Sequence, residues 1–497
     1  MAARFERSSG LLLHPTSLPG PYGIGDLGPA ARRFAITLGR VGVRWWQVLP
    51  LGPTGYGDSP YQTFSAFAGN PYLISPDDLL SEGLLTVADL AALPTFPAGK
   101  VDYGAVIPFK LGLLDRAYER FAARADLRAE MEEFRSRHRA WLDDFALFMA
   151  LKEAHGGAPW TQWEEPLRRR DEKALKKART SLADAVERHI FHQFLFFRQW
   201  RNLREHAHEH AVRFIGDAPI FVAHDSADVW AHPELFDLDE NGNPRVVAGV
   251  PPDYFSPTGQ RWGNPLYRWE EHRRTGYAWW LSRLRLLLEL VDAVRLDHFR
   301  GFAAYWEVPA EEETAEHGRW VPGPGEDFFS AVNDALQSPP LIAEDLGVIT
   351  PDVEALRRKF GFPGMKVLVF AFGSGSDNPF LPHNYTDPNF AVYTTTHDND
   401  TVVGWWNERT TPEERDYARR YLAVSGENIA WDLIRAAWRS TAVLAIAPVQ
   451  DVLSLGNEAR MNYPGRLGGN WAWRMKADLS QNLADRLGEF NALYRRY

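Results

Sequence analysis

The segment Ala293-Val294-Arg295-Leu296-Asp297 is a short, mostly apolar run that ends in an acid. Runs of four to eight apolar residues are typical of strands that are buried on both faces of a parallel sheet. Such runs recur along the chain, and we expect strands at 10–14, 45–49, 212–219, 293–297, 341–344, 365–370, 391–396 and 442–446. Helical periodicity lies between them, for example at 277–290 and 352–360. The sequence therefore alternates strand and helix.

Eight strand–helix units predict an α/β protein with a closed (β/α)8 TIM barrel, and an open sheet of six or seven units is the competing interpretation. About 160 residues with several helical patterns separate the second and third expected strands, which is too long for a plain connection. We therefore divide the chain into barrel units 1–2 (1–69), a mostly helical inserted subdomain (70–205) and barrel units 3–8 (206–497). The segment 221–269 is predicted to be a folded active-site loop, and no separate C-terminal β-domain is expected.

The composition excludes several classes of protein. The chain has 497 residues, of which 45% are hydrophobic and 24% charged, as in ordinary globular proteins. A net charge of −10 argues against a nucleic-acid partner, and the absence of cysteine rules out disulfides and thiolate metal sites. Residues 1–10 lack the apolar core of a signal peptide, and no stretch reaches the length of a membrane span. We expect a cytoplasmic protein without a membrane partner.

Three motifs resemble the sequence signatures of other functional sites. The glycine pattern at 23–28 does not form the tight strand-to-helix turn of a dinucleotide site, because prolines separate it from the preceding strand. The calcium-like loop that starts at Asp237 has Ala248 where the bidentate carboxylate would stand, so a turn is expected. The segment 206–210 fits a zinc-peptidase pattern, but histidines are also favourable at a helix end. We predict neither a cofactor nor a metal.

Four acids stand at or just past the carboxyl ends of expected strands: Asp217, Asp297, Glu344 and Asp398. In a barrel these ends form the rim on which catalytic groups lie. A single acid at a strand end is often a helix cap or a turn residue, but four acids on separate units are harder to explain in this way. They are the candidate catalytic groups.

Strand alternation puts Arg295 and Asp297 on one face of their strand. A neighbouring guanidinium keeps a carboxylate ionised, which would prepare Asp297 as a nucleophile. The alternative is a buried ion pair that holds the barrel together.

Glu344 emerges from an apolar strand into a less solvated setting, and desolvation would raise its pKa as a general acid requires. Asp345 is the rival, although its side chain should point away from that of Glu344. Two carboxylates with separated pKa values are the machinery of glycosidic bond chemistry.

These acids lie in blocks that closely resemble the 4-α-glucanotransferases called amylomaltases or disproportionating enzymes, which are relatives of the α-amylase superfamily. The resemblance runs through nearly the whole chain, at 12–28, 57–62, 216–230, 249–266, 294–301, 342–347, 394–401 and 458–473. It implies that Asp297 is the nucleophile, Glu344 the acid/base and Asp398 a stabiliser of the transition state. The same resemblance implies further contacts with sugar hydroxyls, with the nucleophile or with stacked sugars for Arg295, His298, His397, Asp217, Tyr61, Asp253, Tyr254, Gln260, Trp262, Asn462, Phe370, Tyr103 and Tyr56.

The implied activity is transfer of α-1,4-glucan segments to the 4-hydroxyl of another glucan, with retention of configuration through two displacements and intramolecular cyclisation as a further outcome. Maltooligosaccharides, amylose and glycogen-type polymers are the implied partners. Two other interpretations stay open: an α-glucan hydrolase of the same superfamily, and a non-catalytic glucan-binding protein. The sequence does not fix the smallest donor or acceptor, the extent of cyclisation or the oligomeric state.

Overall fold

The computed structural model describes residues 5–252, 256–466 and 468–497, and its centre is an eight-stranded parallel sheet in the order β10-β11-β12-β1-β2-β3-β6-β9. Each strand overlaps one of the eight expected strands, and the buried, apolar faces explain why these segments pair at the centre of the molecule. The predicted (β/α)8 class is confirmed. The strands are β1 (Ser8–Leu12), β2 (Trp45–Gln47), β3 (Arg213–Ala218), β6 (Ala293–Leu296), β9 (Leu341–Ala343), β10 (Gly364–Val367), β11 (Phe390–Tyr393) and β12 (Leu444–Pro448).

The barrel closes between β9 and β10 with the help of a side chain. The Ala343 N–H donates to the carbonyl of Pro363 over 2.8 Å, and the Met365 N–H donates to Asp345 Oδ1 over 2.7 Å. Asp345 also pairs with Arg357 at 3.0 Å. A Cβ added to Gly364 would lie 2.5 Å from Asp345 Oδ2, so this approach requires glycine. Asp345 therefore supports the seam of the barrel.

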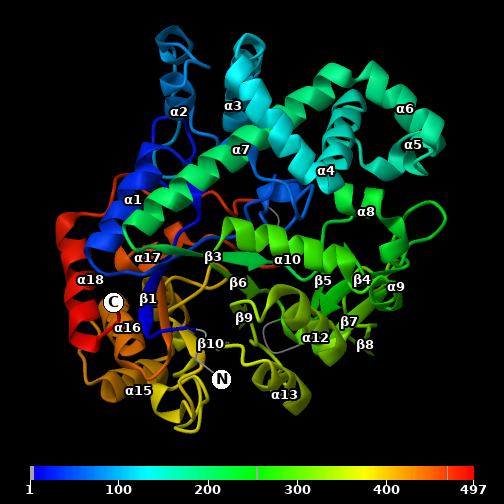
Figure 1. Cartoon of the computed structure of the whole chain (residues 1–497). Coiled ribbons are helices and arrows are strands. Elements are labelled where there is room, and N and C mark those ends of the chain that lie inside the picture. Colours follow the sequence, from blue (N-terminus) through cyan, green and yellow to red (C-terminus); the bar gives the residue numbers. More distant parts are fainter. Residues whose placement is uncertain (1–4, 253–255, 467) are drawn as a thin grey trace.

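Helices cover the outside of the barrel (Figure 1). In α16, for example, Trp431, Ile434 and Trp438 are buried and Arg435 is exposed, which is the periodicity of a helix that packs on one face. The helices expected at 277–290 and 352–360 are confirmed, with ends shifted by at most one residue. The covering helices are α1 (Pro29–Arg40), α10 (Ala278–Leu290), α12 (Gly325–Leu336), α13 (Pro351–Lys359), α15 (Pro412–Leu422), α16 (Ile429–Arg439) and, after β12, α17 (Val449–Val452) and α18 (Gln481–Tyr494).

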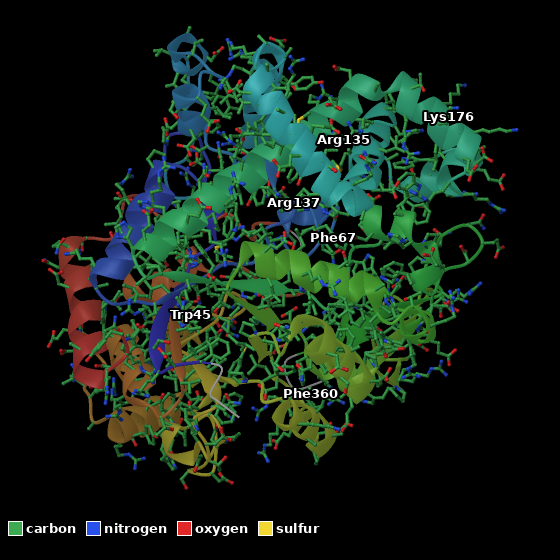
Figure 2. All side chains as sticks on the ribbon, viewed as in Figure 1. Trp45, Phe67, Arg135, Arg137, Lys176 and Phe360 are labelled. Atoms are coloured by element: carbon green, nitrogen blue, oxygen red, sulfur yellow. The ribbon has the colours of Figure 1, made fainter. Side chains whose placement is uncertain are left out.

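The long connection between β2 and β3 is helical and lies on one side of the barrel (Figure 1). Phe67 packs against Trp141 of the connection and Trp279 of α10, with ring centroids 6.2 and 5.7 Å apart, and Figure 2 shows Phe67 where these parts meet. Lys176 projects outward from the far end (Figure 2). The helices are α2 (Pro76–Ser81), α3 (Tyr103–Phe121), α4 (Ala125–Ala154), α5 (Glu165–Arg168), α6 (Glu172–Ser181) and α7 (Ala183–Glu209).

A second, antiparallel sheet in the order β5-β4-β7-β8 was not expected from the sequence. It consists of β4 (Val246–Val250), β5 (Gln260–Pro265), β7 (Ala304–Pro309) and β8 (Arg319–Pro322). The segment 221–269, expected as a loop, also contains α8 (Ala227–Ala231) and ends at α9 (Trp269–Arg274). The sheet forms because β4 pairs with β7, a strand more than 50 residues away, and no local pattern reveals such a pairing.

The rejected motifs have structural roles. Asp239 Oδ1 accepts the N–H groups of Asn241 and Asn243, as in the expected turn. His208 of the zinc-like pattern lies 3.0 Å from Asp292, while the rings of His206 and His210 contact each other. Within the described ranges, no helix is long and apolar enough to cross a bilayer.

Candidate active site

The four acids come together because they follow parallel strands at one end of the barrel. Asp217 is the second-last residue of β3, Asp297 and Glu344 directly follow β6 and β9, and Asp398 follows β11. The Asp217 side chain is fully buried, whereas those of Asp297 and Asp398 are 26% and 40% exposed. Asp297 and Asp398 are therefore open to a ligand, and Asp217 is placed to act through other residues.

Arg295 joins two of the acids. Its Nη1 lies 2.7 Å from Asp217 Oδ2 and 2.9 Å from Asp297 Oδ1. Burial alone would lower the pKa of this guanidinium, but the charges of Asp217 and Asp297 raise it above its usual range. Arg295 and Asp217 form a fully buried ion pair that the sequence did not predict. The alternative that the sequence left open, a purely structural pair between Arg295 and Asp297, does not describe the second contact fully, because the Asp297 side chain is 26% exposed and Arg295 holds a positive charge beside this accessible carboxylate.

Two backbone groups hold the Glu344 carboxyl. Its Oε2 accepts the His298 N–H over 2.8 Å, and its Oε1 accepts the Leu346 N–H over 3.1 Å. His298 adopts a left-handed conformation with φ 51°, a backbone geometry that often occurs at functional sites. Burial raises the pKa of Glu344 to about 8, and the charge of Asp297 adds to the rise while Arg295 opposes it. This raised pKa favours the protonated form of Glu344 at neutral pH.

Asp398 has the opposite electrostatic setting. Burial alone would raise its pKa, but His397 Nε2 at 3.3 Å and the Asn462 amide, which donates to Oδ1 over 2.7 Å, lower this pKa below its usual range. Asp398 in turn raises the pKa of His397 against the effect of burial. Asp398 is therefore ionised at the same pH at which Glu344 holds its proton.

The ring of Tyr61 lies beside these groups, and we call the stacked rings of Tyr61 and His397 the aromatic floor. Its ring stacks on that of His397 with centroids 5.2 Å apart and planes 16° apart, and its hydroxyl donates to Asp217 Oδ2 over 2.8 Å. Trp471 lies 5.5 Å from Tyr61 on a later segment. The floor is therefore tied to both the Arg295–Asp217 pair and the His397–Asp398 pair.

Three more of the expected sugar-contact residues, Gln260, Trp262 and Phe370, lie on two other elements. Trp262 of β5 meets the His298 ring edge to face at 4.8 Å, and its indole N–H donates to Gln260 over 3.2 Å. Burial lowers the pKa of His298 to about 4, so this ring is neutral. Phe370 ends the short 3-10 helix Leu368–Phe370 that follows β10, and its ring packs against that of Phe380 with centroids 5.6 Å apart.

Not every expected residue joins this group. Tyr103 donates its hydroxyl to the Trp471 carbonyl over 3.0 Å, and its ring packs in a small separate apolar cluster with Ile24. Asp253 and Tyr254 lie outside the described residues, as does the side chain of Tyr56. The roles expected for these residues stay predictions.

The structure adds three residues that the sequence did not single out. Trp471 contacts Tyr61 and His397, and His14 lies behind His397. Arg460 donates to the backbone carbonyl of Asp398 over 2.6 Å and pairs with Asp400 at 2.7 Å. A lone aromatic or arginine in a loop carries no sequence signal, because its role depends on a contact with a distant segment.

The raised pKa of Glu344 predicts the pH dependence of donor cleavage. Because the acid must be protonated to act, we expect kcat/KM to be constant just below neutral pH and to fall tenfold per pH unit above about pH 8. Initial rates on a maltooligosaccharide across pH 6–10 measure this limb, with circular dichroism at each pH to exclude unfolding. A profile that stays flat to pH 10 would contradict the assignment of Glu344 as the acid.

A barrel that gathers a protonated glutamic acid and an arginine-paired aspartate at the carboxyl ends of its strands has the features of a barrel enzyme of glycosidic bond chemistry. Comparison with known proteins agrees. The family model described as 4-alpha-glucanotransferase matches residues 13–480. The chain belongs to the 4-alpha-glucanotransferase family.

Three relatives illustrate the similarity. The chain is 58% identical to the 4-alpha-glucanotransferase of Thermus thermophilus over 478 residues, which cover 94% of this chain and 95% of that protein. It is 51% identical to the Synechocystis enzyme of the same name, over 99% of this chain and 98% of the relative. The solved structure of amylomaltase from Streptococcus agalactiae in complex with acarbose superposes with a TM-score of 0.96 at 39% identity, covering 99% of this chain and 100% of that one.

Proposed function

We propose that the chain is a retaining 4-α-glucanotransferase that transfers segments of an α-1,4-glucan to the 4-hydroxyl of another glucan or of glucose. The observation that carries the proposal is the pairing of Glu344, with its pKa raised to about 8, with Asp297, which lies 2.9 Å from the Arg295 guanidinium. Retaining chemistry needs two carboxyl groups with different roles: one that donates a proton to the leaving oxygen and one that attacks the anomeric carbon.

In the first step, an Asp297 carboxylate oxygen attacks the anomeric carbon of the donor. The bond from that carbon to the glycosidic oxygen breaks, and Glu344 transfers its proton to the leaving oxygen. A covalent glycosyl ester on Asp297 results. For this attack the two carboxyl groups need to lie about 5–5.5 Å apart, which stays a prediction.

In the second step, the 4-hydroxyl of an acceptor attacks the same carbon from the face that the leaving group vacated. Glu344, now ionised, takes the hydroxyl proton, and the ester bond to Asp297 breaks. Two inversions retain the α configuration. Asp398, which Asn462 and His397 hold as an anion, is placed to accept hydrogen bonds from sugar hydroxyls as positive charge develops on the ring.

Transfer dominates over hydrolysis only if the acceptor sugar, rather than water, attacks the covalent intermediate. Trp262 and Gln260 lie on β5 at the edge of the second sheet, and Trp262 touches His298 next to Glu344. We infer that a sugar stacked near Trp262 occupies the place from which water would attack. This placement favours a transferase over the alternative of an α-glucan hydrolase.

The product profile from maltotriose separates these functions. A transferase forms maltooligosaccharides longer than three units together with shorter ones, whereas a hydrolase forms only shorter products. Chromatography of the early products measures the difference. If only shorter products form, the transferase proposal is contradicted. If no product forms at all, the result favours a glucan-binding protein. The cytoplasmic location and the absence of a cofactor stay predictions.

A further inference from the structure

A small cavity lies behind the aromatic floor, among the segments that follow β1 and β11. Its volume is about 20 Å³, and its lining includes His14, Ser17, Thr395, Thr396 and His397. A cavity of this size holds one water molecule when at least two polar groups are available to bind it.

Two histidine nitrogens in the lining lack a protein partner. His14 and His397 are 6% and 5% exposed, and in the described part of the chain no protein group hydrogen-bonds the buried Nδ1 of either ring. His397 already uses Nε2 toward Asp398 at 3.3 Å. Burial lowers the pKa of His397, but the neighbouring Asp398 raises it overall and so favours the protonated ring. In that form the imidazole is a donor at both nitrogens, and Nδ1 requires an acceptor.

No hydroxyl of the lining donates to His14 Nδ1, since this atom has no hydrogen-bond partner among the described residues. Ser17 donates to the Trp473 carbonyl over 2.7 Å, Thr395 donates to Asp451 over 2.7 Å, and Thr396 donates to Asn399 over 2.8 Å. In the tautomer of neutral His14 that carries its proton on Nε2, Nδ1 is an acceptor and needs a hydrogen from a group that is not one of these side chains. A water molecule satisfies both rings at once, because it accepts from one and donates to the other.

We propose that the cavity binds one structural water that accepts from His397 Nδ1–H and donates to His14 Nδ1, and that His14 is a positioning residue for His397 and, through it, for Asp398. The functional part of this inference rests on the role proposed above for Asp398. His397 then has a fixed hydrogen bond at each nitrogen, so its ring cannot turn away from Asp398.

The charges around the pair agree with this arrangement. Asp398 and Asp217 favour protonation of His397, while Arg295 opposes it. Burial and the charge of His397 lower the pKa of His14 to about 3, so His14 remains neutral. Arg460 also lines the cavity, but it is engaged with Asp398, Asp400 and Asn462.

Two substitutions of similar size separate the roles of His14. His14→Leu removes the acceptor, and we expect kcat on maltotriose to fall about tenfold or more while KM changes less than about twofold. His14→Asn presents an amide oxygen near the position of Nδ1, and we expect it to keep kcat within about threefold of the wild type. Equal kcat in His14→Leu and the wild type would overturn the positioning role.

Nitrogen NMR of histidine-labelled protein provides a test that does not depend on activity. His397 signals, assigned with a His397→Gln variant, should show Nδ1 protonated at pH 7 in the wild type. In His14→Leu the pKa of His397 should fall, and in His14→Asn it should not. An unprotonated Nδ1 in the wild type overturns the proposal even if His14→Leu does not fold. If the wild type makes no transfer products but the NMR result holds, the proposed function fails and the water site stands.

Discussion

Replacing Asp297 with Asn is expected to lower the kcat/KM for maltotriose disproportionation by about 10⁴-fold or more, because an amide cannot form the glycosyl ester and nucleophile losses in covalent enzymes are of this size. The side chain is nearly isosteric, and only the charge beside Arg295 Nη1, 2.9 Å away, disappears. Glucan binding should persist, since Asp398, His397 and Tyr61 are unchanged. Initial rates and binding by calorimetry measure the two quantities.

Asp292→Asn is the matched control for this change. Asp292 precedes the same strand, at its opposite end, and its carboxylate holds Arg204 at 2.6 Å and the Phe214 N–H at 2.8 Å. We expect this variant to lower the melting temperature while keeping kcat/KM within a few-fold. If Asp297→Asn retains more than a few per cent of the activity, Asp297 is not the nucleophile.

Glu344→Ala is expected to lower the rate on maltotriose by about 10²–10⁴-fold and to leave the first step on an α-maltosyl fluoride nearly intact. Fluoride departs without a proton, so the missing acid matters only for natural donors. We choose Ala because Gln would turn an amide group toward one of the two N–H donors, His298 or Leu346. A fluoride electrode records the first step, and chromatography records transfer.

The wild type and the Asp297→Asn variant are the positive and negative controls for this experiment. The wild type should release fluoride and transfer the sugar, whereas Asp297→Asn should do neither. A Glu344→Ala variant that loses fluoride release as completely as it loses maltotriose activity would show that Glu344 does not act as a proton donor.

The barrel could be predicted because a local pattern in the sequence marks each of its strands. Each strand is an apolar run such as Leu341–Ala343, and a parallel sheet buries both faces of such a run. The second sheet could not be predicted, because β4 and β7 are short and half-buried and are specified mainly by each other. The strand expected at 45–49 is shorter in the structure, where β2 ends at Gln47. Val48 and Leu49 belong to the following loop but are apolar and as buried as strand residues, so the sequence pattern does not show where the strand ends.

The acids were found because each follows a recognisable strand, and the Arg295–Asp297 pair was found from alternation. The hydrogen bonds that decide their protonation were not accessible. Glu344 depends on the backbone N–H of His298, and Asp398 depends on Asn462, 64 positions further along the chain. A sequence shows which residues stand at the rim, but these contacts form only when separate loops fold over it.

The covalent intermediate on Asp297 is the central claim, and mass spectrometry of the Glu344→Ala variant tests it most directly. With a maltosyl fluoride donor and no acceptor, the first step should proceed and the second should stall, because no base remains to activate an incoming hydroxyl. Trypsin releases the peptide 296–300, in which Asp297 is the sole side-chain carboxylate. We predict that this peptide carries the mass of one maltosyl unit. An adduct on a peptide that contains Asp217 or Asp398 instead, or fluoride release without any adduct, would contradict the double-displacement mechanism.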